Sequence, residues 1–247
     1  LANAWRGIQT WVSDPPRTVT VKNNIVYGMW DAGISNGQGS TGMVESYNLF
    51  FNNPVNSLGL ASAGIADFQA DPLFTDVLNG DFSLTAGSPA VNAGTDLGYP
   101  KNGPAPDIGA LESSFVTGPG FVAGTAQTGG YAYTYRPVVP VPGAKVALDA
   151  DPNTLAYTAA DGTYRLPLAP GTHAMTATYD YADPVTNSPT VTAGTTTTWN
   201  ITLLPEPGAV YYVSPTGSDY TGDGSLTTPD AIALQRIAAE LAEAGTE

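Results

Sequence analysis

The sequence has 247 residues and a net charge of −14 at pH 7, from 22 acidic and 8 basic residues. This balance, with no basic stripe to offset it, excludes a nucleic acid as partner, because the chain would repel a polyanion. The absence of cysteine excludes disulfides and thiolate zinc sites, and no stretch approaches the about 18 apolar residues that a membrane-spanning helix needs.

Residues 1–54 carry a repeat. Gly7-Ile8 recurs as Gly33-Ile34, and Asn24-Ile25-Val26-Tyr27 recurs as Asn48-Leu49-Phe50-Phe51, at nearly equal spacings. Such a period predicts short stacked strands that rise about 4.8 Å per repeat, with inward apolar residues in contact with their counterparts in the next repeat. At the corners we expect Asn to adopt a left-handed φ and to hydrogen-bond through its amide to the Asn of the neighbouring repeat.

Four stretches follow the repeat in a fixed order: Asp71-Pro72-Leu73-Phe74, Gly80-Asp81-Phe82-Ser83-Leu84, Gly87 to Gly94, and Asp107 to Glu112. With the repeat, they make residues 1–114 resemble the C-terminal coils of bacterial right-handed parallel β-helix proteins of the pectate-lyase-like superfold. Val91-Asn92 and Leu111 depart from that family, whose members often have Ile-Asp and Tyr there. Phe82 and Leu84 alternate with Ser83, as expected of a half-buried strand, and the Gly- and Pro-rich stretch 94–109 predicts a loop wrapped over the last coil.

Residues 115–208 have another character. After the linker-like SSFVTGPG, short apolar stretches recur about every ten residues with turns between them, which is typical of a small β-sandwich. The stretches Pro142 to Leu148, Thr158 to Leu166 and Pro170 to Met175 make this segment resemble carboxypeptidase-regulatory-like domains, which implies a transthyretin-like or Ig-like sandwich. Asp161-Gly162 predicts a hairpin turn.

Residues 209–247 resemble the first coil of a second β-helix, with a strand at Tyr212 and a capping α-helix. Pro229 suits the first helical position, with Thr228 as N-cap, and Gly245 would end the helix. One apolar stripe is expected along it, formed by Leu234, Ile237, Ala238 and Leu241. The resemblance implies that this helix covers the open end of a stack.

In chain order, the sequence therefore contains the last coils of one β-helix, a sandwich and the first coil of another β-helix. Three interpretations of this order stay open. The chain is a window of tandem units, or its C-terminal cap covers a neighbouring chain head to tail, or the cap closes its own stack. The sequence starts at Leu1 without a signal peptide, so we expect an internal or processed piece of a longer protein. A head-to-tail contact that does not close would build a filament.

No catalytic residue is assigned. β-helix lyases use Lys or Arg as base and β-helix hydrolases use paired carboxylates. The candidates are the bases Arg6, Arg17 and Lys22 and the acids Asp14, Asp31 and Glu45. None lies in a recognisable motif, so we expect them on the solvated surface of the coils, and the serines have no partner base for a triad.

No metal site or cofactor is assigned either, and calcium is the one cation left open. Asp219 and Asp223 in DYTGDGS resemble a calcium loop but lack the later bidentate Glu, so a polar turn is the alternative. Asp149, Asp151 and Asp161 form a weaker candidate set. His173 is the single histidine and has no second His or Cys to share a metal.

Aromatic residues are the candidates for glycan stacking. Tyr131, Tyr133 and Tyr135 alternate at the start of the sandwich, and Trp30 lies with Trp5, Trp11 and Tyr27 in the first coils. Rings on one exposed strand face can stack on sugars. Packing between domains is the alternative for all of them.

The low share of charged residues, 12%, and the 28 Gly and 21 Pro favour strands and turns over helices. This composition predicts an all-β protein. The resemblances imply its parts: a short right-handed parallel β-helix (1–114), a sandwich (115–208) and a β-helix cap (209–247). The expected function is that of a non-catalytic extracellular or cell-surface scaffold, adhesive or fibre subunit, whose partner is itself or further tandem units. The alternatives are a fragment of a polysaccharide lyase or glycoside hydrolase, with its catalytic coils outside this chain, and a glycan-binding module.

Overall fold

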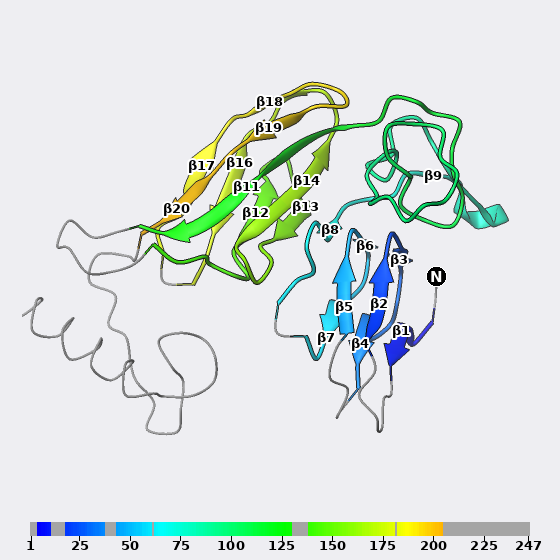
Figure 1. Ribbon diagram of the computed structural model, residues 1–247, viewed down its shortest axis with the longest axis horizontal. Coiled ribbons are helices and arrows are strands. Elements are labelled where there is room, and N and C mark those ends of the chain that lie inside the picture. Colours follow the sequence, from blue (N-terminus) through cyan, green and yellow to red (C-terminus); the bar gives the residue numbers. More distant parts are fainter. Residues whose placement is uncertain are drawn as a thin grey trace, which may run out of the picture. The chain divides into compact units, whose positions relative to one another are not determined.

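The computed structural model describes residues 4–10, 18–37, 43–60, 62–129, 138–180 and 182–204 (Figure 1). The chain divides into two compact units, Leu1–Pro205 and Glu206–Glu247. The second unit lies outside the described residues, and with it the predicted strand at Tyr212 and the predicted capping helix. Within the described residues the protein is all-β, as predicted, and the one helical element is the 3-10 turn η1, Val77–Asn79. None of the described segments forms a helix with the length and hydropathy that a bilayer crossing requires.

Residues 4–69 form what we call the strand stack, in which the strands of successive repeats pair in parallel. The strands are β1 (Arg6–Thr10), β2 (Val19–Lys22) and β3 (Ile25–Tyr27) in the first repeat, β4 (Ala32–Asn36), β5 (Met43–Ser46) and β6 (Leu49–Phe51) in the second, and β7 (Val55–Leu58) and β8 (Phe68–Gln69) in the third. They pair in the orders β1-β4-β7, β2-β5 and β3-β6-β8.

The pairing registers confirm the sequence repeat. Ile8 is paired with Ile34, and Ile25 with Leu49, as the recurrence of these residues in the sequence predicted. The glycine of each Gly-Ile pair is required by close approach, because a Cβ at Gly7 would lie 2.5 Å from the carbonyl oxygen of Gly33. A glycine at this position therefore lets successive repeats approach each other.

The sheet formed by β3, β6 and β8 has two apolar faces. Its inward residues Val26 and Phe50 pack with Ile34, whereas Ile25, Leu49 and Phe68 point the other way and pack with buried residues of a later segment. That segment, residues 84–114, is named the covering segment here, and it contributes Leu84, Ala90, Val91, Ala93 and Ile108 to the core. It starts at the last residue of the hairpin formed by β9 (Phe74–Asp76) and β10 (Asp81–Leu84).

The outer loop of the covering segment lies elsewhere than predicted. It contacts the corner of the first described repeat: Asn23 Nδ2 donates to Thr95 O at 2.8 Å, Thr95 N donates to Asn23 Oδ1 at 2.9 Å, and Gly109 N donates to Asn23 O at 2.9 Å. The predicted strand at Phe82–Leu84 is present, but its two apolar residues differ in burial. Leu84 is buried, whereas Phe82 is 42% exposed and rests edge-on against Phe74.

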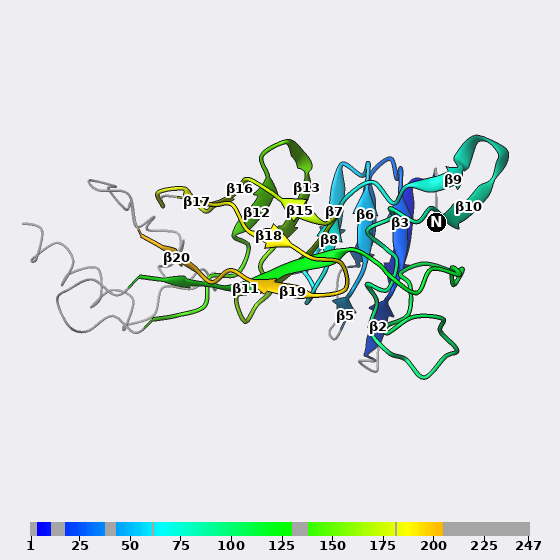
Figure 2. The ribbon, with the colours of Figure 1, turned by 90° about the horizontal axis from the view of Figure 1, so that it is seen from above.

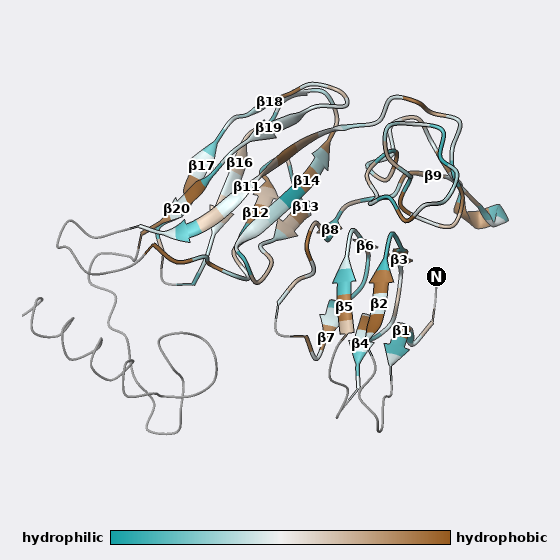
Figure 3. Cartoon of the chain, viewed as in Figure 1, coloured by the Kyte–Doolittle hydropathy of each residue, from teal (hydrophilic) through white to brown (hydrophobic). Residues whose placement is uncertain are grey.

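Residues 120–204 form the predicted sandwich-like pair of sheets (Figure 2). One sheet has the order β14-β11-β19, with β20 paired to the far half of β11, and the other contains β17-β16-β12-β13. The bounds are β11 (Gly120–Thr128), β12 (Lys145–Leu148), β13 (Asp151–Tyr157), β14 (Thr163–Leu168), β15 (Gly171–Thr172), β16 (Met175–Thr178), β17 (Val185–Asn187), β18 (Thr190–Val191), β19 (Thr196–Thr198) and β20 (Ile201–Leu203). The start of β11 is apolar (Figure 3), and its residues Phe121 and Val122 are buried.

The Asp161-Gly162 turn does not form the predicted hairpin. Gly162 has φ +77° and its N–H donates to Ala159 O, so the tight turn itself exists. The strands on either side, β13 and β14, belong to opposite sheets. The turn therefore carries the chain from one layer to the other rather than joining two paired strands.

One sheet extends from the strand stack into the sandwich. Its seven strands have the order β17-β16-β12-β13-β8-β6-β3, and β13 meets β8 through the antiparallel pair Leu155 and Gln69 (Figure 1). A second bridge pairs Ala63 with Ala159. We call these contacts between the stack and the sandwich the junction. They cover the edge strand of the third repeat, which would otherwise present unpaired backbone groups.

Candidate functional site

A column of amide and carboxyl side chains runs through the corner of the strand stack. Asn24 N and Nδ2 both donate to Asn48 Oδ1 at 3.1 Å. Asn48 N and Nδ2 donate in turn to Asp67 Oδ1, at 2.7 and 3.1 Å, and Nδ2 also donates to Val21 O at 3.0 Å. The predicted bonding between corner asparagines is therefore present, and the third repeat continues it with a carboxylate.

The left-handed corner residue is the one before each member of this column. Asn23, Tyr47 and Ala66 have φ values of 55°, 55° and 58°, so the prediction that the bonding Asn itself takes the left-handed conformation was wrong. The two roles are separated because the left-handed residue turns the chain, and the next side chain then points along the stack to its counterpart.

Two buried carboxyl groups meet where the column ends. Glu45 is 6% exposed and Asp67 is 5% exposed; Glu45 Oε2 accepts a hydrogen bond from Ser57 Oγ at 3.0 Å. Burial raises the pKa of Glu45 from 4.5 to about 7, and burial together with the charge of Glu45 raises the pKa of Asp67 well above its usual value. The expectation that Glu45 lies on the solvated surface was wrong.

The pair has room for one shared proton. Glu45 Oε1 and Asp67 Oδ2 are both buried and accept no hydrogen bond from a fixed donor among the described residues. A proton on either carboxyl supplies the missing donor for the other. Two like charges in a site of low dielectric repel strongly, which favours a proton on the pair over two ionised carboxylates.

A cavity of about 420 Å³ adjoins Asp67 at the junction. Its stack side includes Asn53, Asn56, Ser57 and Gln69, and its sandwich side includes Leu155 and Tyr157 of β13. Asn56 Nδ2 donates to Gln69 Oε1 at 3.0 Å, whereas the buried Asn56 Oδ1 has no partner among the described residues. The cavity therefore has a polar wall and an apolar wall.

Arg165 of β14 links the sandwich to the covering segment and to the stack. Its guanidinium carbon lies 3.4 Å from the ring centroid of Phe121 and 6.0 Å from that of Tyr47, and its Nη1 donates to Ala93 O at 3.0 Å. Desolvation lowers the pKa of Arg165. The cation is stabilised by the two rings and the carbonyl, which makes Arg165 a structural residue of the junction.

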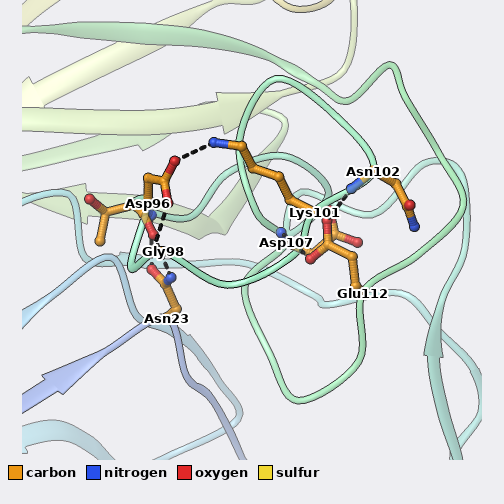
Figure 4. A network of polar contacts seen from close by, with 8 residues as sticks. Asn23, Asp96, Gly98, Lys101, Asn102, Asp107 and Glu112 are labelled. Atoms are coloured by element: carbon orange, nitrogen blue, oxygen red, sulfur yellow. Dashed lines mark hydrogen bonds and ion pairs between the residues drawn. The ribbon is translucent and has the colours of Figure 1, made fainter.

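The covering segment is held by a polar network at its surface (Figure 4). Lys101 Nζ contacts Asp96 Oδ2 as an ion pair, and Asp96 Oδ1 accepts from Gly98 N at 2.8 Å. Glu112 accepts from the backbone N–H groups of Asn102 and Asp107, at 3.2 and 3.1 Å. These contacts hold in place a segment that contains no strand. Its carboxylates are used in these hydrogen bonds and in the ion pair.

The structure brings two of the predicted catalytic candidates together, as an ion pair. Arg6 Nε lies 2.6 Å from Asp31 Oδ2, and Arg6 Nη1 donates to Ser35 Oγ at 3.4 Å. Lys22 is half-buried on β2. Arg17 and Asp14 lie outside the described residues. The pairing of β1 with β4 sets Arg6 beside Asp31, so the pair joins two successive repeats.

The predicted aromatic residues separate into packed and exposed ones. Tyr27 stacks on Phe51 with ring centroids 5.7 Å apart, whereas Trp30 is 71% exposed and Trp5 is 65% exposed. The candidates Trp11, Tyr131, Tyr133 and Tyr135 lie outside the described residues. Trp30 is therefore the member of the predicted glycan-stacking set whose exposure the structure establishes.

The described metal candidates serve local structure. His173 hydrogen-bonds through Nε2 to Ala169 O at 2.7 Å, Asp149 Oδ1 accepts from Thr176 Oγ1 at 2.7 Å, and Asp161 Oδ1 accepts from Thr163 Oγ1 at 2.6 Å. Asp151 Oδ2 accepts from Thr154 Oγ1 at 2.8 Å. Across residues 4–204, gaps excepted, no three His, Cys, Asp or Glu side chains form a group that could hold a metal. Asp219 and Asp223 lie outside the described residues.

Sequence reasoning missed Asp67, Asn56, Gln69 and Arg165. A signal existed for one of them: Asp67-Phe68 corresponds to Asn48-Leu49, but the third repeat is shorter than the first two. The cavity and the arginine contact had no local signal, since each joins residues far apart in the sequence.

Residues 138–204 match the family model of the carboxypeptidase regulatory-like domain. The match begins after β11 and covers β12 to β20 of the sandwich. No curated protein matches the chain. The resemblance predicted for this part of the sequence is thereby confirmed for residues 138–204.

Proposed function

We propose that this chain is a structural segment of a secreted or cell-surface protein. In this proposal residues 1–114 are the last coils of a right-handed parallel β-helix, and the sandwich seals the end of that helix. Parallel strands that pair at the period of the sequence repeat support the first part. The regulatory-like match supports the second part and an extracellular location.

One observation carries the proposal, namely the sheet that runs without interruption from β3 to β17. A single apolar core accompanies it, since Leu49 and Phe68 of the stack belong to the same buried cluster as Val146 and Met175 of the sandwich. A junction with both backbone pairing and a shared apolar core resists relative motion of its two parts. That property suits a load-bearing spacer better than a hinge.

The same contacts give little support to an enzyme. Arg6 is paired with Asp31, and Glu45 is buried against Asp67. A general base or nucleophile needs access to its substrate. For this reason we assign no reaction to the described residues.

We further propose that residues 209–247 serve assembly, through the predicted cap with Leu234, Ile237, Ala238 and Leu241 on its apolar stripe. The cap would cover the open first coil of a neighbouring chain or of the next tandem unit. A contact of this kind is heterologous and does not close, so it gives linear polymers.

Electron microscopy and light scattering of the purified protein test this proposal. The 247-residue chain should form long particles without added substrate, and a chain that ends at Gly208 should have the mass of a monomer. Equal masses for the two chains would contradict head-to-tail assembly and leave the tandem-unit version. Release of unsaturated or reducing sugars from a polysaccharide would contradict the structural proposal as a whole.

Glycan binding at the surface is the second candidate function. The exposure of Trp30, 71%, favours it, because a large ring that is not used in packing offers a flat apolar face to a sugar. This role is compatible with an adhesive scaffold.

A further inference from the structure

We propose that the junction cavity is a binding site for one uncharged sugar unit. This site is separate from Trp30 and does not depend on the spacer role. The proposal rests on the size of the cavity, on the distribution of polar and apolar groups over its walls, and on the absence of a basic residue among the described residues that line it.

The volume suits a small ligand. The cavity measures about 420 Å³, and small-molecule sites usually span about 300 to 1,000 Å³. It lies between elements that are fixed on both sides, since β8 and β13 are paired at Gln69 and Leu155. A ligand would therefore meet walls that are already in place, which lowers the cost of ordering them.

The polar wall includes the amide side chains of Asn56 and Gln69. Asn56 Nδ2 is used by Gln69 Oε1, which leaves Asn56 Oδ1 as a buried acceptor without a partner among the described residues. The other end of the Gln69 amide is a donor group. Sugar hydroxyls can hydrogen-bond to the polar groups of this wall, and a rotation of the Asn56 amide would bring its unpartnered acceptor to a hydroxyl donor.

The apolar wall suits the other face of a sugar ring. Tyr157 lines the cavity and is 40% exposed, so its ring is available for stacking against C–H groups. Leu155 lies beside it on the same strand. A polar wall opposite an aromatic one is the arrangement that a polyol with one hydrophobic face requires.

The charge of the lining selects against acidic sugars. No Lys, Arg or His occurs among the described residues of the lining, whereas Asp67 adds a carboxyl group. A uronate would place its carboxylate there without a counter-charge, at a cost in desolvation. The site should therefore prefer neutral hexoses and pentoses to galacturonate, unlike the groove of an enzyme for acidic polysaccharides.

Saturation-transfer NMR and calorimetry with the 247-residue protein test the inference. The probes are glucose, galactose, mannose, xylose and N-acetylglucosamine, with galacturonate as the acidic comparison. At least one neutral sugar should bind with a dissociation constant of about 1 mM, as expected for a ligand of this size. Galacturonate should bind at least about tenfold more weakly.

Two variants locate the site, and two others serve as controls. Asn56→Ala and Tyr157→Ala should each weaken binding at least about tenfold, while Tyr179→Ala, an exposed tyrosine elsewhere in the sandwich, and Trp30→Ala should leave it unchanged. Circular dichroism of each variant verifies folding, and either of the two test variants suffices if the other fails to fold. The inference is overturned if no neutral sugar binds at about 20 mM, if galacturonate binds best, or if Trp30→Ala alone abolishes binding.

Discussion

Replacing Glu45 by glutamine should stabilise the protein above neutral pH and reduce the pH dependence of its unfolding between pH 5 and about pH 8. The folded state raises the pKa of Glu45 from 4.5 to about 7, so it holds a proton that the unfolded chain has already lost. Stability from this proton is fully present below pH 4.5 and is lost as the pH rises through about 7. The loss amounts to about 3 kcal/mol for the wild type.

The glutamine should avoid this loss because it cannot ionise. Its amide can donate to Asp67 Oδ2, which is the bond that the shared proton makes in the wild type. Asp67 then no longer faces a like charge, which is the second cause of its raised pKa. The variant should therefore be more stable than the wild type at about pH 8 and similar to it at about pH 5.

Urea unfolding at these two pH values measures the effect. Asp67→Asn removes the second member of the pair and should flatten the profile as well, although the new amide also changes the bonds to Asn48. Glu112→Gln is the matched control at an exposed carboxylate and should retain the pH dependence of the wild type. A wild type that is equally stable at both pH values would rule out the shared proton.

The Asn48→Ala variant should lose about 3 kcal/mol or more of its free energy of unfolding. The Asn48 side chain is fully buried and makes four hydrogen bonds: two from Asn24, one to Val21 O and one to Asp67. Its removal leaves buried donors and acceptors without partners on both neighbouring repeats. Each such group costs about 1 to 3 kcal/mol, although water that enters the gap offsets part of the sum.

Chemical denaturation with circular dichroism as readout measures this loss. Asn187→Ala is the control, since Asn187 is exposed and its Oδ1 accepts one local bond, from Ser188 N. That variant should change stability by less than about 0.5 kcal/mol. Similar small losses for both variants would show that the column contributes no more than surface polar groups do.

The sequence allowed the first two repeats of the stack to be predicted, because their apolar residues and corner asparagines recur at nearly constant spacing. Ile8 and Ile34, and Ile25 and Leu49, pair as expected. The third repeat was missed, since it shortens and replaces Asn by Asp67. A substitution of this kind hides a repeat from pattern matching while keeping the hydrogen-bond acceptor that the column needs.

The junction could not be predicted from the sequence. Gln69 pairs with Leu155, which lies far from it along the chain, and no local pattern tells one edge strand which other edge it meets. The buried state of Glu45 had the same origin, because it depends on Ser57 and Asp67 from the next repeat. Local propensity predicted the strands and turns, while pairings between distant strands determine the candidate sites.

The central claim, that the sandwich is joined to the last repeat of the stack through paired strands, has a direct chemical test. The chain contains no cysteine, so a double variant reports on one contact only. Ala63 and Ala159 form a β-bridge, and paired residues of neighbouring strands lie within the Cα separation of about 4.4 to 6.8 Å that a disulfide spans. Asn187 provides the control position, because it lies on β17, the terminal strand at the sandwich end of the seven-stranded sheet.

The measurement is the yield of intramolecular disulfide after mild oxidation, read by mass spectrometry of a non-reduced digest. The account predicts a high yield of the crosslink in the Ala63→Cys/Ala159→Cys variant and none in the Ala63→Cys/Asn187→Cys variant. Free thiols in both variants, or equal crosslinking in both, would contradict the junction and the structural role that rests on it.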